Sequence, residues 1–227
     1  MWAVYKKELK SYFLSPIGYV VMGVLLFVCA VFFYLTTISY GSIDLGGLYF
    51  YAALYGFMIV IPILTMRMFA EERKNGTEQL ILTSPVSMVG VVIGKFLAAM
   101  SVIFITLLIS FIYFGIMSYF GSPNIKVLLV AMLGFLLISG SAISFGMFAS
   151  SITENQIIAG IITITFLVMS LFVPDLGKGF PDIAIINLYQ KFPSGVISLT
   201  ELVGTISFAI MFIAFTIIVM QRRKLVK

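Results

Sequence analysis

Six long apolar runs without a charged residue constrain most strongly what this chain can fold into. They cover residues 17–40, 48–66, 96–117, 127–149, 157–173 and 202–220. A helix needs about 20 apolar residues to cross the hydrocarbon core of a bilayer, and the fifth run is the shortest. A soluble domain is about 45–50% apolar, whereas this chain is 61% apolar. The sequence predicts an all-α polytopic membrane protein in which residues 1–227 form a single six-span transmembrane domain.

The basic residues predict the orientation of these spans. With the N-terminus inside, all but three of the 14 lysine and arginine residues fall on the inner side, the exceptions being Lys126, Lys178 and Lys191. Such an excess is typical of cytoplasmic segments. We therefore expect both termini in the cytoplasm and the protein in the cytoplasmic (inner) membrane. The net charge of +5 then reflects orientation and does not indicate a nucleic-acid partner.

Residues 1–15 are too polar to cross a membrane, and they have an amphipathic pattern. Lysines and other polar residues occupy one side of the expected helix, which lies in the headgroup plane. Its apolar side is formed by Trp2, Tyr5, Leu9, Tyr12 and Phe13. Pro16 is expected to end this interfacial helix. A signal peptide is the alternative, although no small-residue cleavage site follows.

The charged segment 67–95 separates the second and third runs and contains a predicted short helix. Residues 71–74 are expected to extend the second helix beyond the membrane, and Gly76 to end it in a left-handed conformation. Asn75 or Thr77 can begin a new helix over 77–83, which Pro85 stops, and Ser87 can begin the third long helix. An ordinary cytoplasmic loop over 70–87 is the alternative.

The connections of the second half carry weaker signals. Thr153 and Gln156 have the spacing of a capping box that would start the fifth helix. The outer segment 174–201 is turn-rich and then apolar for half a span, which predicts a short re-entrant or interfacial helical hairpin. A disordered loop is the alternative.

Small residues recur every four positions in the fourth run and predict close helix packing. This packing could lie within one chain or between two copies. The residues are Gly140, Ala142, Ser144, Gly146 and Ser150.

Catalytic and ion-carrying chemistry has no support in the sequence. The chain has no histidine, and the six runs have none of the ionisable residues that mark the pathways of self-sufficient carriers. The stretch Gly90 to Lys95 reads GVVIGK and is one residue too short for a P-loop. We expect no catalytic residue, no metal and no cofactor in this chain, so any transport must be driven by ATP hydrolysis in another subunit.

Four stretches carry a resemblance to a known family. They are EERKNGTEQLILTSPVS after the second run, the opening YKKELKSYFLSPIGYV, SSITENQIIAG before the fifth run and YQKFPSGVISLTEL before the sixth. Together they resemble the membrane subunits of ABC transporters of the ABC type 2 (exporter permease) family. The similarity is greatest to the gliding-motility and nitrous-oxide-reductase-maturation types.

The resemblance implies partners and roles that the residues alone do not. Such a subunit pairs with a second permease copy or paralogue and with two cytoplasmic ATPases, which bind ATP and Mg. The interfacial helix would be the elbow helix, and 77–83 the coupling helix. The expected ATPase contacts are Glu71, Glu72, Arg73, Gly76, Thr77, Glu78, Leu80, Ile81, Leu82, Thr83 and Pro85. The alternative is a mechanotransmitting scaffold that passes ATPase strokes to an extracytoplasmic partner protein.

Overall fold

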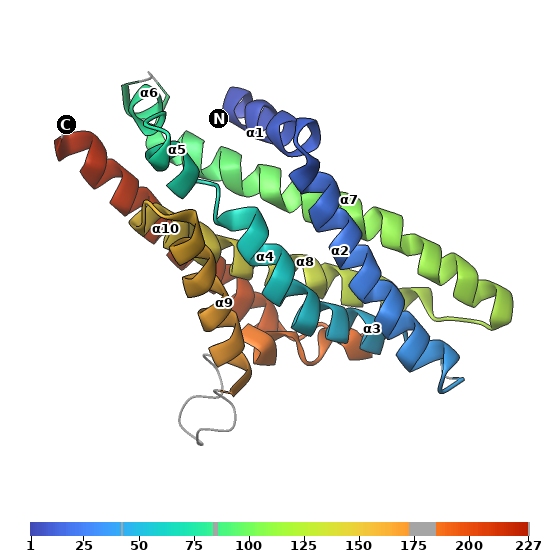
Figure 1. Cartoon of the computed structure of the whole chain (residues 1–227). Helices are drawn as coiled ribbons and strands as arrows, with labels where there is room; N and C mark the ends of the chain where they lie inside the picture. The colour runs from blue at the N-terminus through green and yellow to red at the C-terminus, as the bar shows by residue number, and fades with distance from the viewer. Residues whose placement is uncertain (42, 84–85, 173–184, 227) are drawn as a thin grey trace.

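The computed structural model describes residues 1–41, 43–83, 86–172 and 185–226, and these form helices and no strand (Figure 1). The α-helices are α1 (Trp2–Leu14), α2 (Pro16–Phe33), α3 (Leu45–Tyr51), α4 (Phe57–Thr65), α5 (Ala70–Lys74), α6 (Glu78–Thr83), α7 (Met88–Phe120), α8 (Ile125–Ile152), α9 (Gln156–Phe172) and α10 (Leu199–Val226). Two π-helical segments, η1 (Tyr34–Ile38) and η2 (Ala52–Gly56), and two 3₁₀ helices, η4 (Ile185–Tyr189) and η5 (Phe192–Ser194), complete the described elements.

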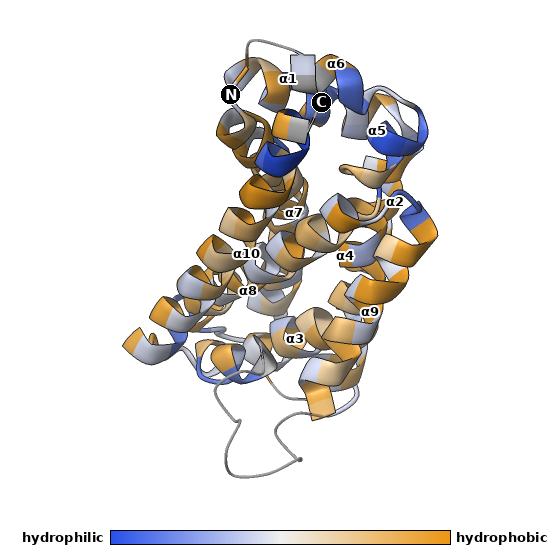
Figure 2. Cartoon of the chain, turned by 90° about the vertical axis from the view of Figure 1, so that its left-hand side faces the viewer, coloured by the Kyte–Doolittle hydropathy of each residue, from blue (hydrophilic) through white to orange (hydrophobic). Residues whose placement is uncertain are grey.

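Five helical stretches are long and apolar enough to cross a membrane: Pro16–Ile38, Leu45–Lys74, Met88–Tyr119, Ile125–Ile152 and Leu199–Leu225. The fifth predicted span corresponds to α9, which has 17 residues and is shorter. Figure 2 shows hydrophilic residues gathered at the end of the bundle that holds both termini, α1, α5 and α6. The chain is thus an all-helical, multi-pass membrane protein, while the sixth crossing stays a prediction.

The second span starts earlier than predicted and does not continue unbroken into the charged segment. Asp44 accepts a hydrogen bond from Gly47 N at 2.8 Å, so the helix begins at Leu45. Residues 66–69 form a turn that separates α4 from α5. The expectation of one continuous helix through residues 71–74 is therefore wrong.

A serine from another helix replaces the backbone hydrogen bonds that this turn lacks. The Ser150 hydroxyl on α8 accepts hydrogen bonds from Phe69 N and Ala70 N, both at 3.1 Å, and donates to Met66 O at 3.2 Å. Ser150 is fully buried. One hydroxyl therefore satisfies three backbone groups that would otherwise lie unpaired in an apolar interior.

Helix α8 lies at the centre of the bundle, in contact with α4, α7, α9 and α10. All five small residues of its predicted packing stripe are buried inside this chain. A methyl group on Gly146 would overlap Thr65 of α4, and one on Gly140 would touch Met100 and Phe96 of α7. Of the two arrangements left open by the sequence, the structure shows packing within the chain.

Two helix starts illustrate the local signals. Ser87 accepts a hydrogen bond from Gly90 N at 3.2 Å and begins α7, as predicted. The capping box at Thr153 is wrong, because α9 begins after Asn155, whose side chain accepts from Ile157 N at 2.9 Å. The Thr153 hydroxyl instead accepts from Asn155 N at 3.1 Å. Asn155 is the better cap because its side chain directly precedes the first helical turn.

The opposite end of the bundle is closed by the described part of the segment between α9 and α10. Tyr189 and Phe192 are fully buried, and Tyr189 donates a hydrogen bond to Ala131 O at 3.1 Å. Both rings pack against Gly134 of α8, where a methyl group would overlap them. Two short helices thus lie in the predicted outer segment, and residues 174–184 of that prediction lie outside the described residues.

Candidate functional site

The candidate site is the charged end of the bundle, where segments far apart in the sequence meet. It includes α1, α5, α6, the first two turns of α7, the turn between α8 and α9, and the end of α10 (Figures 1 and 2). Two clusters of ion pairs hold these segments together. The meeting of both termini and the 67–95 segment at one end agrees with their predicted placement on a single side of the membrane.

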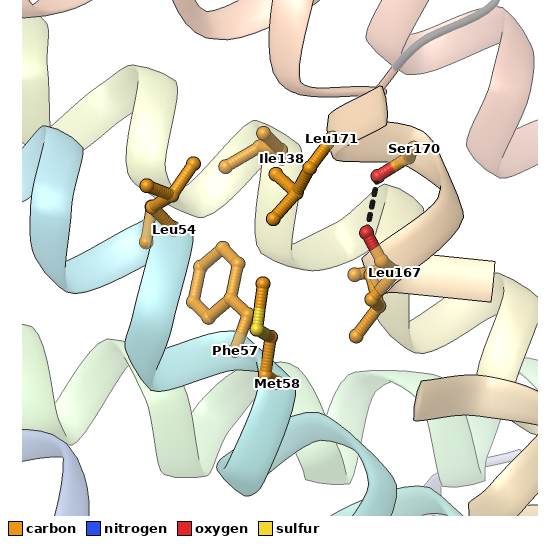
Figure 3. Close-up of a pocket in the computed structure, with 9 residues that line it drawn as sticks. Leu54, Phe57, Met58, Ile138, Leu167, Ser170 and Leu171 are labelled. Carbon is orange, nitrogen blue, oxygen red and sulfur yellow. Dashed lines mark hydrogen bonds between the residues drawn. The ribbon is translucent and has the colours of Figure 1, made fainter. Parts of the chain in front are cut away.

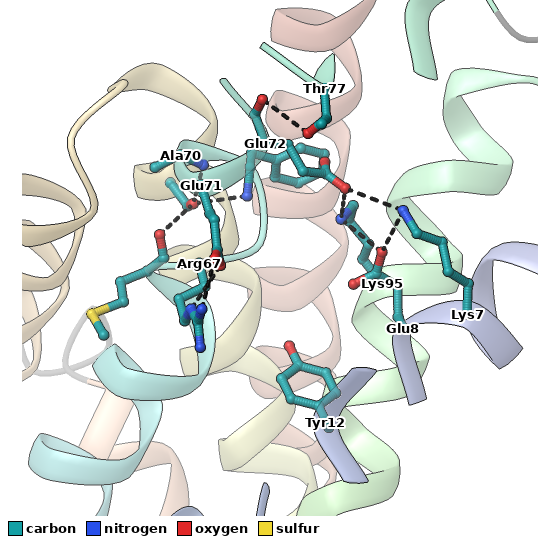
Figure 4. A network of polar contacts seen from close by, with 12 residues as sticks. Lys7, Glu8, Tyr12, Arg67, Ala70, Glu71, Glu72, Thr77 and Lys95 are labelled. Atoms are coloured by element: carbon teal, nitrogen blue, oxygen red, sulfur yellow. Dashed lines mark hydrogen bonds and ion pairs between the residues drawn. The ribbon is translucent and has the colours of Figure 1, made fainter. Parts of the chain in front are cut away.

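The first cluster is centred on Lys95, which is 2% exposed despite its charge. Its ammonium donates to Glu72 Oε1 at 2.8 Å and to Glu8 Oε1 at 3.0 Å, and it lies 5.3 Å from the centre of the Phe69 ring. Lys7 adds a second cation, 3.8 Å from Glu72 and 3.7 Å from Glu8 (Figure 4). A buried charge is tolerated only when it is paired, so this cluster joins α1, α5 and α7.

The second cluster is centred on Glu78, the first residue of α6, which is 7% exposed. Arg223 of α10 donates to Glu78 Oε1 at 3.2 Å, and Arg73 Nε lies 3.4 Å from Glu78 Oε2. Arg73 also donates to Ser151 O at 2.6 Å and to Ile152 O at 3.3 Å. The start of α6 is thereby attached to α5, to α10 and to the end of α8.

Helix α5 belongs to both clusters through two adjacent residues. Glu72 joins the Lys95 cluster and Arg73 joins the Glu78 cluster. A third pair joins Glu71 of α5 to Arg67 in the preceding turn, through two hydrogen bonds of 2.6 Å, and is more exposed. Such paired, two-point contacts fix orientation as well as distance, so α5 is held firmly although it has only five residues.

The predicted contact segment projects beyond these clusters. Gly76 has a φ of +72°, which favours glycine, and it turns the chain from α5 into α6 as predicted. The Thr77 hydroxyl donates to Glu72 O across this turn at 3.2 Å. Leu80 is 72% exposed and Thr83 is exposed on α6, whereas the side chains of Ile81 and Leu82, and all of Pro85, lie outside the described residues. The predicted ATPase contacts are therefore of two kinds, since Glu78 faces its own chain and Leu80 faces outward.

The residues of the predicted interfacial helix are likewise divided. Trp2 is 63% exposed and stacks on Tyr5, with the ring centres 5.0 Å apart. Tyr5 shares a hydrogen bond with Ser101 of α7 at 3.0 Å, and Tyr12 donates to Leu64 O at 3.3 Å. Burial and the nearby Glu8 raise the pKa of Tyr12 well above its ordinary value, so its hydroxyl remains a donor. Leu9 and Phe13 are half-buried, and α1 ends at Leu14, before Pro16 begins α2.

A small cavity of about 20 Å³ lies deeper, between the second span, α8 and α9 (Figure 3). Its lining is apolar except for Ser170, whose hydroxyl donates to Leu167 O at 2.7 Å. Among the described residues, no charged side chain lines it and no group of His, Cys, Asp or Glu could hold a metal. Gly90 and Lys95 lie inside helix α7 and not in a strand-to-helix loop. The charged end is therefore where the described chain concentrates its polar chemistry.

Sequence reasoning missed the pairing of these charges. It identified Glu72, Arg73 and Glu78 as surface contacts, but it assigned no partner to Lys95 or Arg223. The available signal was the position of Lys95, two turns into the long helix that Ser87 begins. A lysine this far into an apolar helix is expected to be buried, and a buried ammonium needs a carboxylate partner.

Comparison with known families adds one finding. A family model described as "ABC-2 family transporter protein" matches residues 43–219, which is more than half of the chain. Comparison with curated proteins gave no match. The matched region includes the charged segment, both of its flanking spans and most of α10.

Proposed function

Because the chain belongs to the ABC-2 family of transporter proteins and is an ABC transporter permease subunit, we propose that α6 is the point at which ATPase subunits drive it. Membership of this family implies association with ABC ATPases and with the membrane. In the proposed complex, two permease copies or paralogues pair with two ATPases, which bind ATP and Mg, while this chain does no covalent chemistry. We propose the gliding-motility or nitrous-oxide-reductase-maturation type as its subtype, on the resemblance of the sequence alone.

The observation that supports this proposal is the division of α6 into an anchored start and an exposed surface. Glu78 ties the helix to Arg73 and Arg223, and Leu80 is 72% exposed. Leu80 is a large apolar side chain exposed at the charged end of the bundle, where a partner can reach it. A force applied to α6 would reach the second span through Arg73 and the last span through Arg223. The proposal places six spans in the inner membrane with both termini in the cytoplasm.

No observation on the described residues favours the alternative of a scaffold that moves no substrate. The extracytoplasmic partner that it needs would have to contact the far end of the bundle. The part of that end that the structure describes is closed by its own residues, Tyr189 and Phe192. We therefore retain the transporter function alone.

The test is a pair of matched leucine substitutions in the full complex. Leu80→Asp places a charge on the exposed surface of α6, and Leu199→Asp does the same at the start of α10, where Leu199 is 78% exposed at the opposite end. The measurement is the amount of ABC ATPase that copurifies with the tagged chain from its native membrane. We expect Leu80→Asp to remove the ATPase and Leu199→Asp to keep it. Equal copurification with both variants would exclude α6 as the contact.

A further inference from the structure

A polar cleft lies beside the Lys95 cluster, and its lining includes Leu80 of the proposed ATPase contact. Its volume is about 380 Å³, and it lies between α1 and the junction of α4 and α5. Figure 4 shows Arg67 and Glu71 on one side, Lys7, Glu8 and Lys95 on the other, and Tyr12 between them. A cavity of this size can hold a small polar group of several heavy atoms.

The cleft contains charges of both signs. Among the described residues that line it, three are cationic and three are carboxylates. Lys7 is the most accessible cation, with 66% of its side chain exposed, and Arg67 and Glu71 are about one third exposed on the opposite wall. Glu72 Oε2 is buried and has no hydrogen-bond partner. A ligand that carries both a negative and a positive group, with no net charge, therefore matches the cleft best.

The position of the cleft indicates where such a ligand comes from. Ile17 from the first turn of α2 and Met68 from just beyond α4 line it together with the charged groups. The hydrophobic stretches of the first two spans thus begin and end at the level of the cleft. Mixed apolar and charged surroundings at the end of a span are typical of the headgroup region of a bilayer.

We propose that this cleft binds the headgroup of a phospholipid that carries a phosphate and a primary ammonium, the phosphatidylethanolamine class. Lys7 and Arg67 bind the phosphate, since both can donate charge-assisted hydrogen bonds to it. The primary ammonium has three N–H donors and is bound by the carboxylates of Glu71 and Glu72.

The same lining disfavours the other common headgroups. A quaternary ammonium has no N–H to donate and is bound best by several aromatic faces, whereas the described part of the lining has a single aromatic residue, Tyr12. A headgroup with a net negative charge has a phosphate but no ammonium. Its phosphate would lie near the carboxylates of the cleft, with no positive group of the lipid between them. Leu80 belongs both to this lining and to the exposed surface of α6, so lipid binding is measured on the isolated chain, without any ATPase.

The test measures lipid binding to the purified, delipidated full-length chain. Phosphatidylethanolamine, phosphatidylcholine and phosphatidylglycerol with identical acyl chains are titrated separately, and bound lipid is counted by native mass spectrometry. We expect the first to bind more tightly by about tenfold, the effect of one charge-assisted hydrogen bond. Equal affinities for the three lipids would overturn the proposal. The proposal would also be overturned if free glycerophosphoethanolamine, which has no acyl chains, displaced the lipid at the concentrations at which the lipid itself binds. The ligand would then be a soluble molecule and not a membrane lipid.

Two matched substitutions locate the site. Glu71→Gln removes a carboxylate from the cleft and releases Arg67 from its pair, so selectivity should shift toward phosphatidylglycerol. Glu154→Gln is the control, because Glu154 is exposed in the turn between α8 and α9 at the same end and does not line the cleft. Unchanged selectivity in Glu71→Gln, or the same shift in both variants, would refute the assignment to this cleft. The wild-type comparison tests the proposal even if a variant fails to fold.

Discussion

The hydroxyl of Ser150 gives the sharpest test of how the second span is held. Ser150→Ala removes one oxygen atom from a fully buried site and changes the side chain in no other way. Three backbone groups lose their partner: Phe69 N, Ala70 N and Met66 O. At about 1 kcal/mol for each hydrogen bond, the free energy of unfolding should fall by about 3 kcal/mol. For a chain of this size that corresponds to an apparent Tm lower by roughly 6–12 °C.

A second serine on the same helix provides a matched control. Ser144 is also fully buried, but its hydroxyl donates only to Ser141 O of its own helix, at 2.7 Å. Ser144→Ala should therefore lower the free energy of unfolding by less than about 1 kcal/mol, since a helical carbonyl retains its backbone partner. Thermal unfolding of both purified variants in one detergent gives the comparison.

Hydrogen exchange locates the effect in the chain. In Ser150→Ala, the amides of Phe69 and Ala70 should exchange faster, in a peptide that covers residues 66–75, while Ser144→Ala leaves that peptide unchanged. Loss of stability without faster exchange in this peptide would show that Ser150 does not hold the turn. Equal Tm values for the two variants would refute the reasoning altogether.

Two further substitutions test the packing and the charges. Lys95→Met should lower the free energy of unfolding by about 3 kcal/mol, because it removes the buried cation between two carboxylates and leaves them the more exposed Lys7. Lys10→Met, on the exposed side of α1, should change it little. Equal Tm values would contradict the structural role of the cluster. Gly146→Ala should lower the free energy of unfolding by about 1–3 kcal/mol, because the added methyl group overlaps Thr65. Gly115→Ala is the control, since Gly115 has open space around it. An unchanged Tm for Gly146→Ala would show that α4 and α8 can move apart without loss of stability.

The elements that could be predicted depend on neighbours in the sequence. The apolar runs predicted the positions of the long helices because a span needs a minimum length of hydrocarbon-compatible residues. Pro16, Gly76 and Ser87 predicted helix boundaries because each acts on its own backbone or on the next turn. Local chemistry failed where two caps competed, since Asn155 and not Thr153 begins α9.

The elements that could not be predicted depend on tertiary contacts. Lys95 pairs with Glu8, which is 87 residues away in the sequence. Arg223 pairs with Glu78, which is 145 residues away in the sequence. Ser150 was identified as a small packing residue, but its hydrogen bonds to residues 66–70 required the crossing of α8 and the second span. The charged segment could thus be located from the sequence, whereas the pairing of its charges inside the chain could not.

The adjacent placement of Glu72 and Arg73 on α5 has a mechanical consequence. Glu72 is bound to Lys7 of α1 and Lys95 of α7, and Arg73 is bound to Glu78 of α6 and to the end of α8. The five residues of α5 are therefore tied on two sides at once, so a displacement of this helix strains contacts to α1 and α7 together with contacts to α6 and α8.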